Sequence, residues 1–94
     1  MNKYESVIII NPNLEDDPRK ELITKIETLI NDNGKVTKID EMGKKKLAYE
    51  IQKCKEAFYV VFYFEAEASF ISELERHFRI TEDILKFMTV KKDN

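Results

Sequence analysis

The run Phe-Tyr-Val-Val-Phe-Tyr-Phe at residues 58–64 restricts the fold of this chain more than any other segment. Every residue in the run is aromatic or β-branched, and such residues favour a β-strand. Side chains alternate between the two faces of a strand, so one set comprises Phe58, Val60, Phe62 and Phe64, and the other Tyr59, Val61 and Tyr63. The fully apolar set is predicted to face a core, which requires a sheet covered on one side.

Three further strands and two helices are predicted around this run. β-branched and aromatic residues mark the strands, and apolar residues three or four positions apart mark the helices. Gly43 is expected to form a bulge or a bend within its strand, and Gly34 a left-handed helix stop. The predicted elements are a strand over 4–10, a helix from Asp16-Asp17-Pro18 to Asn33-Gly34, a strand over 35–51, a loop over 52–56, the strand 58–64, a helix with Ser69 as N-cap and Phe70, Ile71, Leu74 and Phe78 on its apolar side, and a strand over 84–90.

The order strand, helix, strand, strand, helix, strand describes two split βαβ units. Right-handed crossovers then place both helices on one face of a four-stranded antiparallel sheet. The predicted fold class is therefore α+β, a ferredoxin-like two-layer sandwich. No repeat or flexible linker interrupts the sequence, so residues 1–94 are expected to form a single domain.

The sheet face without helices is predicted to be unusually apolar. Alternation along the first strand leaves hydrocarbon side chains on this face, and the last strand adds more. An exposed apolar patch of this kind favours a protein partner. The expected partner-facing residues of this open sheet are Val7, Ile9, Tyr59, Val61, Tyr63, Met88 and Val90.

Cations are concentrated in the segment Lys44-Lys45-Lys46, just before an apolar stretch that contains Tyr49. The chain has 16 Lys and Arg against 18 Asp and Glu, so any contact with phosphate has to be local. Cations on a strand can neutralise backbone phosphates without reading sequence, and a tyrosine can stack or donate a hydrogen bond. A solvated lysine run is the alternative reading.

Catalytic and metal-binding chemistry finds little support. His77 has no serine, cysteine or second histidine in a triad-like or zinc-ligand spacing and is interpreted as a surface residue. Cys54 is the single cysteine, which excludes an internal disulfide and, with the lack of an apolar leader, favours a cytoplasmic protein. We therefore expect no enzyme activity, no cofactor and no metal.

Aromatic residues on a central strand also invite comparison with the RNA-recognition motif, in which rings on the open sheet stack bases. That motif has a basic residue and then a glycine ahead of its aromatics, whereas Glu56 and Ala57 stand here. The comparison is therefore the weaker of the two nucleic-acid readings.

Six segments, in the same order along nearly the whole chain, match the pattern of one known family. They are Lys3-Tyr4-Glu5, Asn11-Pro12-Asn13-Leu14, Gly43-Lys44-Lys45-Lys46-Leu47-Ala48-Tyr49, Phe58-Tyr59-Val60-Val61, Phe78-Arg79-Ile80 and Ile84-Leu85-Lys86-Phe87-Met88-Thr89-Val90-Lys91. In these segments the sequence resembles the family of bacterial small-subunit ribosomal protein S six.

This resemblance implies a structural constituent of the small (30S) ribosomal subunit, located in the ribosome. Such a protein is expected to be monomeric when free and to bind the central domain of 16S ribosomal RNA together with a smaller basic protein, S eighteen. No small-molecule substrate and no membrane are expected. The implied RNA-facing or partner-facing positions are Lys3, Tyr4, Lys44, Lys45, Lys46, Tyr49, Arg79 and Lys86.

A second function class stays open from the residues themselves. A ferredoxin-like regulatory or small-ligand-binding module that homodimerises through its open sheet face would also explain the apolar patch. It leaves the lysine run unexplained. An acylphosphatase-like enzyme of the same topology is remote, because Asn11-Pro12-Asn13-Leu14 stands where a phosphate-binding loop is needed.

Overall fold

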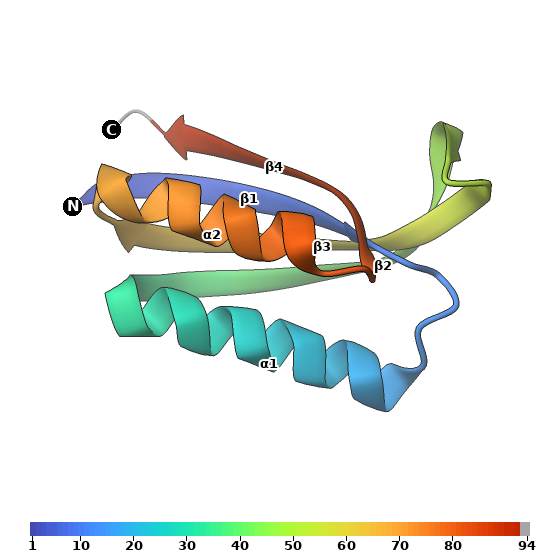
Figure 1. Cartoon of the computed structure of the whole chain (residues 1–94), viewed down its shortest axis with the longest axis horizontal. Coiled ribbons are helices and arrows are strands. Elements are labelled where there is room, and N and C mark those ends of the chain that lie inside the picture. The colour runs from blue at the N-terminus through green and yellow to red at the C-terminus, as the bar shows by residue number, and fades with distance from the viewer. Residues whose placement is uncertain (93–94) are drawn as a thin grey trace.

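Six elements follow one another in the computed structural model, which describes residues 1–92. They are β1 (Asn2–Ile10), α1 (Asp16–Asn33), β2 (Gly34–Ile51), β3 (Cys54–Ala66), α2 (Ala68–Ile80) and β4 (Ile84–Lys92). The strands form one antiparallel sheet in the order β2-β3-β1-β4, and both helices pack on the same face of it (Figure 1). The predicted ferredoxin-like sandwich is confirmed.

The hydrophobic core lies between the sheet and the two helices. The inward-facing residues of β1 and β3 pack against one apolar side of each helix, as the strand and helix periodicities predict. The core comprises Tyr4, Ile8, Ile10, Ile23, Ile26, Ile30, Val60, Phe62, Phe64, Ala66, Phe70, Leu74, Phe78 and Ile84.

Helix α1 ends at Asn33 as predicted, but two predictions about helix caps are wrong. Helix α2 begins at Ala68 with Glu67 as N-cap, so Ser69 lies inside the first turn and caps nothing. Gly34 is extended, with φ −173°, instead of left-handed, and it opens β2 directly. A Cβ at Gly34 would collide with the carbonyl oxygen of Glu65 on β3. The glycine therefore serves the close approach of two strands and not the helix stop.

The β2–β3 hairpin is longer than predicted. The predicted loop over 52–56 is too long, because β3 already begins at Cys54 and the strands are joined by a two-residue turn at Gln52 and Lys53, which have φ values of 49° and 67°. The predicted bulge is confirmed, since Gly43 has φ 78° and the register shifts between Glu41 and Gly43. The hairpin extends beyond β1 and β4 and curls at its tip (Figure 1).

Candidate nucleic-acid and protein interface

The open face of the sheet is a regular grid set by strand register. Directly paired residues share a face, so β3, β1 and β4 contribute one residue each to every row. The three rows are Tyr59, Ile9 and Lys86; Val61, Val7 and Met88; and Tyr63, Glu5 and Val90. All seven residues expected on the partner-facing open sheet therefore lie on one face, the one opposite the helices.

The apolar part of this grid is only partly exposed. Met88 is 58% exposed and Val90 39%, whereas Val61 is 8% exposed and the remaining members of the set are intermediate. Exposed hydrocarbon is thus concentrated on β4, at one edge of the sheet. A protein partner that docks on this face would contact β4 first. The role of these seven residues in binding a partner is a prediction.

The curled hairpin forms a groove with the open face. The groove has a volume of about 270 Å³, and its lining includes Leu47 and Tyr49 from β2, Ile9 from β1 and Met88 from β4. Lys86 Nζ donates a hydrogen bond of 3.0 Å to Tyr49 Oη and lies 5.6 Å from the centre of the same ring. The fold thereby brings together two of the predicted site residues, which are 37 positions apart in sequence.

Leu47 is a member of this groove that the sequence analysis did not single out. It is buried, with 9% of its surface exposed, although it belongs to an edge strand. Its burial follows from the bend of the hairpin over the sheet. The apolar character of Leu47 was the available signal, but the bend itself has no marker in the sequence.

The three consecutive lysines are exposed but do not share one face of β2. Their partners on β3 are Phe58 for Lys44, Ala57 for Lys45 and Glu56 for Lys46. Lys44 Nζ lies 5.3 Å from the centre of the Phe58 ring on the helix side, and Arg19 of α1 places its guanidinium 3.9 Å from the same ring. Because side chains alternate, Lys45 points to the open side. The run therefore presents cations on both sides of an edge strand.

The other predicted basic and aromatic positions are dispersed. Lys3 is exposed on the open side of β1, whereas Arg79 is exposed on α2, with its guanidinium 5.8 Å from the centre of the Phe87 ring. Tyr4 is 7% exposed and stacks on Phe64 in the core, with ring centres 5.6 Å apart. Alternation along β1 turns this ring toward the helices, which argues against a base or partner contact.

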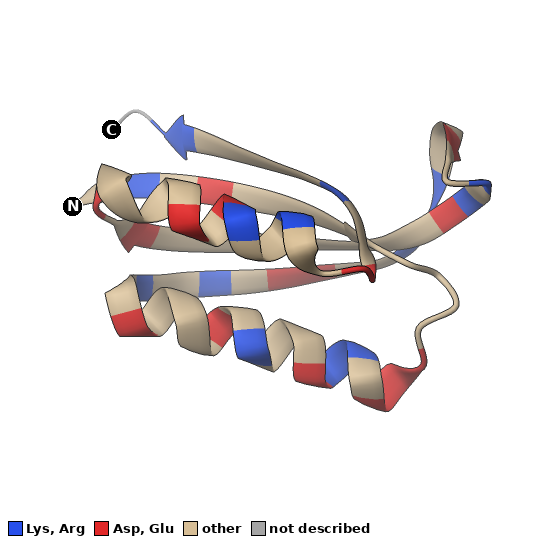
Figure 2. Ribbon diagram, viewed as in Figure 1, with Lys and Arg blue, Asp and Glu red and all other residues tan. Residues whose placement is uncertain are grey.

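Charge is separated between the two layers. The strands and the hairpin turn, residues 1–10, 34–66 and 84–92, carry eleven lysines against six carboxylates. Residues 11–33 and 67–83, which form the helices and their flanking turns, carry five cations against eleven carboxylates. Blue bands accordingly predominate on β2 and β4 in Figure 2, and red bands are frequent on the helices. A chain with formal net charge −2 thus has a basic sheet layer and an acidic helix layer.

Two further features are absent from residues 1–92. No group of His, Cys, Asp and Glu in this range is arranged to hold a metal ion. None of the helices in this range has the length and apolar character to cross a membrane.

Comparison with known proteins fits this geometry. A family model described as ribosomal protein S6 matches residues 3–91. The chain belongs to this family. It is 42% identical to the small ribosomal subunit protein bS6 of Heliobacterium modesticaldum, with 99% of this chain and 98% of that protein covered. The bS6 protein of Thermoanaerobacter pseudethanolicus is 39% identical, with 99% of each chain covered.

A solved structure supports the same assignment. The crystal structure of 30S ribosomal protein S6 from Thermotoga maritima superposes with a TM-score of 0.93 at 35% identity, covering 97% of this chain and 87% of that one. Membership makes the chain a protein of the small ribosomal subunit, a family of ribosomal structural proteins. Association with ribosomal RNA and a role in translation follow from that membership.

Proposed function

We propose that this chain binds the central domain of 16S ribosomal RNA together with the basic small-subunit protein S eighteen. In this role, exposed lysines neutralise RNA phosphates and the open sheet face contacts the protein partner. The chain performs no chemistry; it is a structural constituent of the ribosome in the cytoplasm. The observation that carries the proposal is the separation of charge, which leaves a basic, partly apolar sheet layer beside an acidic helix layer.

Each surface suits a different partner. The apolar rows around Val7 and Met88 offer hydrocarbon to a protein, which interfaces bury at their centre. Lys44, Lys45 and Lys46 are exposed at the edge strand, where ammonium groups reach phosphates without a base contact. A mildly acidic chain gains RNA affinity from a basic companion, because the companion supplies further counter-charge.

Filter binding to the central-domain RNA tests the proposal directly. The chain is titrated against labelled RNA with and without purified S eighteen. We expect weak retention of RNA by the chain alone and strong retention by the pair. Equal and negligible retention in both titrations would refute the proposed function.

The lysine contribution is tested with the variant K44A/K45A/K46A. Each lost phosphate contact should reduce the slope of log affinity against log salt by about 0.7 to 0.9. The matched control is K20A/K25A/R76A, which removes three cations from the helix layer. If the salt slope of K44A/K45A/K46A equals that of the parent chain, these lysines make no phosphate contacts.

The protein contact is tested with a charge placed on the open face. Met88→Asp should weaken binding to S eighteen by at least about tenfold, because it desolvates a carboxylate within an apolar contact. Ile80→Asp is the control, since Ile80 is 68% exposed on α2, on the other face of the molecule. If both variants bind the partner as the parent chain does, the open face is not the contact.

A further inference from the structure

A second group of cations lies at the opposite end of the sheet from the hairpin. Strand register places Lys35 of β2, Lys3 of β1 and Lys92 of β4 in one row, with Glu65 of β3 among them. Lys38 stands in the next row, beside Tyr63. All four lysines are exposed, and we name them the terminal lysine strip: Lys3, Lys35, Lys38 and Lys92.

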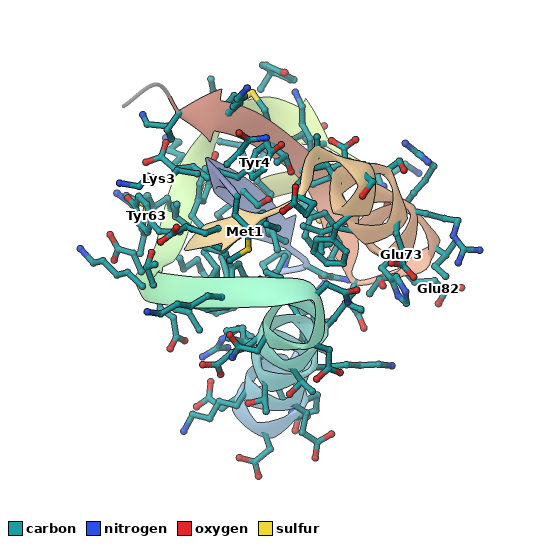
Figure 3. All side chains as sticks on the ribbon, turned by 90° about the vertical axis from the view of Figure 1, so that its left-hand side faces the viewer. Met1, Lys3, Tyr4, Tyr63, Glu73 and Glu82 are labelled. Carbon is teal, nitrogen blue, oxygen red and sulfur yellow. The ribbon has the colours of Figure 1, made fainter. Side chains whose placement is uncertain are left out.

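Alternation places the strip on the open side of the sheet. Val36 is partly buried against the core, so its neighbour Lys35 points the other way, and Lys38 Nζ lies 5.6 Å from the centre of the Tyr63 ring. Lys3 and Tyr63 lie next to each other on the side away from both helices (Figure 3). The strip therefore combines positive charge with an aromatic ring on one surface.

The local carboxylates do not cancel this charge. Among residues 1–92, these two rows hold four lysines and two carboxylates, Glu65 and Glu5, of which Glu5 forms an ion pair of 3.2 Å with Lys92. The Lys92 side chain remains 51% exposed in this pair, and an exposed pair contributes little and is readily exchanged. A groove of about 380 Å³ runs between these residues, and its lining includes Lys3, Tyr63 and Lys92. A phosphate can approach the strip from solvent.

We propose that the terminal lysine strip is a second binding surface for RNA backbone phosphates, separate from Lys44, Lys45 and Lys46. Between the β3 partners Glu65 and Ala57 the strand runs for about 26 Å, at about 3.3 Å per residue. This separation exceeds the Debye length of about 8 Å at physiological salt. The two lysine groups therefore contact different phosphates and act independently.

The ligand is assigned as RNA instead of protein on grounds of charge. This step rests on the proposed function, in which the protein partner on the apolar rows is basic. A basic protein would be repelled by four lysines, whereas an RNA strand beside it neutralises both proteins. The strip borders Val90 and Tyr63, at the end of the apolar rows, so RNA would run along the margin of the protein contact.

Chemical protection in the assembled small subunit provides the first test. Lysines are acetylated with a water-soluble reagent in the free chain and in intact small subunits, and modification is measured by mass spectrometry. We expect Lys35, Lys38 and Lys92 to be acetylated at least about fivefold more slowly in the subunit than in the free chain. This protection should disappear after ribonuclease digestion. Lys20 and Lys25 serve as controls and should not be protected. Protection that survives digestion would assign the strip to a protein, and absence of protection would overturn the proposal.

A second test measures affinity. The variant K35Q/K38Q/K92Q, titrated with the basic partner against central-domain RNA, should bind about tenfold more weakly and lose about two units of salt slope. The control K20Q/K25Q/R76Q changes net charge equally and should match the parent chain. Combining the strip variant with K44A/K45A/K46A should add the two effects, because the groups are independent.

The two tests separate failure of the strip from failure of the proposed function. If the parent chain binds RNA with its partner and the strip variant binds equally well, the strip proposal is refuted and the proposed function stands. If the parent chain does not bind the central-domain RNA, the proposed function is refuted, and the protection measurement decides whether the strip contacts RNA elsewhere in the subunit. Unchanged thermal unfolding of every variant verifies that folding is intact.

Discussion

Ser6 is a buried polar residue whose hydroxyl is paired with that of Thr89. Its side chain has no exposed surface, and its Oγ lies 2.7 Å from Thr89 Oγ1 on the paired strand β4. Ser6→Ala would leave the Thr89 hydroxyl without this partner, so we expect a loss of about 1–2 kcal/mol in the free energy of unfolding. Urea denaturation measures it.

A double variant separates the hydrogen bond from the packing. Replacing Ser6 by Ala and Thr89 by Val together removes both polar groups and should recover part of the loss, since no unpaired hydroxyl remains. Ser72→Ala, at an exposed helical position, should change stability by less than about 0.5 kcal/mol. If the double variant were as unstable as the sum of two independent losses, the hydroxyl pair would not be the cause.

The two glycines are needed for different reasons and should respond differently to alanine. At Gly43, φ is 78° and a Cβ would meet nothing within 4 Å, so Gly43→Ala should cost about 1 kcal/mol through the backbone alone. Gly34→Ala should cost more, because its Cβ would collide with the Glu65 carbonyl and separate β2 from β3. Thermal unfolding ranks the two, and a greater loss at Gly43 would contradict the assignment. Gly43→Asn should recover part of the loss, since asparagine tolerates this φ.

At the scale of elements, the turn of the β2–β3 hairpin is a site of stored strain. Gln52 and Lys53 both have positive φ, which costs non-glycine residues about 1–2 kcal/mol each. Two-residue turns of this kind favour Asn-Gly. Gln52→Asn with Lys53→Gly should therefore raise the free energy of unfolding by about 1 kcal/mol, measured by urea denaturation. Lys53→Ala alone is the control for the lost charge, and equal stability of parent and double variant would count against a strained turn.

Elements with a local sequence signal could be predicted, and the turn of this hairpin lacks such a signal. The cores of β1, α1, β3 and β4 follow from local periodicity, because alternating or helically spaced apolar residues state which side is buried. Gln-Lys carries no turn signal, so the sequence predicts a loop at the end of the hairpin. The contact between Tyr49 and Lys86 depends on the bend of that hairpin, which is a consequence of three-dimensional shape. The division of Lys44, Lys45 and Lys46 between the two faces of β2 follows from strand alternation alone.

For the whole molecule, the charge distribution disfavours a homodimer through the open face. Packing two such faces about a two-fold axis brings the terminal lysine strip of one copy against either the strip or the basic hairpin end of the other. Like charges at an interface oppose association. Sedimentation of the free chain at about 50 µM should therefore show a monomer of 11.2 kDa, and a complex with S eighteen should form when central-domain RNA is present to neutralise both proteins. A stable homodimer without RNA would instead favour a regulatory module.

The separation of charge into two layers also predicts how RNA binding responds to mutations on the far side. Glu73 and Glu82 lie on the α2 side, away from Lys3 and Tyr63 (Figure 3), and the molecule is 22 Å across in its thinnest direction. At about 0.15 M salt the Debye length of about 8 Å screens these carboxylates from RNA bound at the sheet.

Neutralising three carboxylates of the helix layer tests this screening. E21Q/E73Q/E82Q raises the formal net charge by three from −2, as much as the strip variant lowers it. We expect RNA affinity within about twofold of the parent chain at about 0.15 M salt, and a several-fold gain at about 0.01 M, where the Debye length reaches about 30 Å. K35Q/K38Q/K92Q should weaken binding at both concentrations, because it removes direct phosphate contacts. If both variants followed net charge alone at 0.15 M, with equal and opposite changes in affinity, binding would depend on overall charge and not on where the lysines are placed.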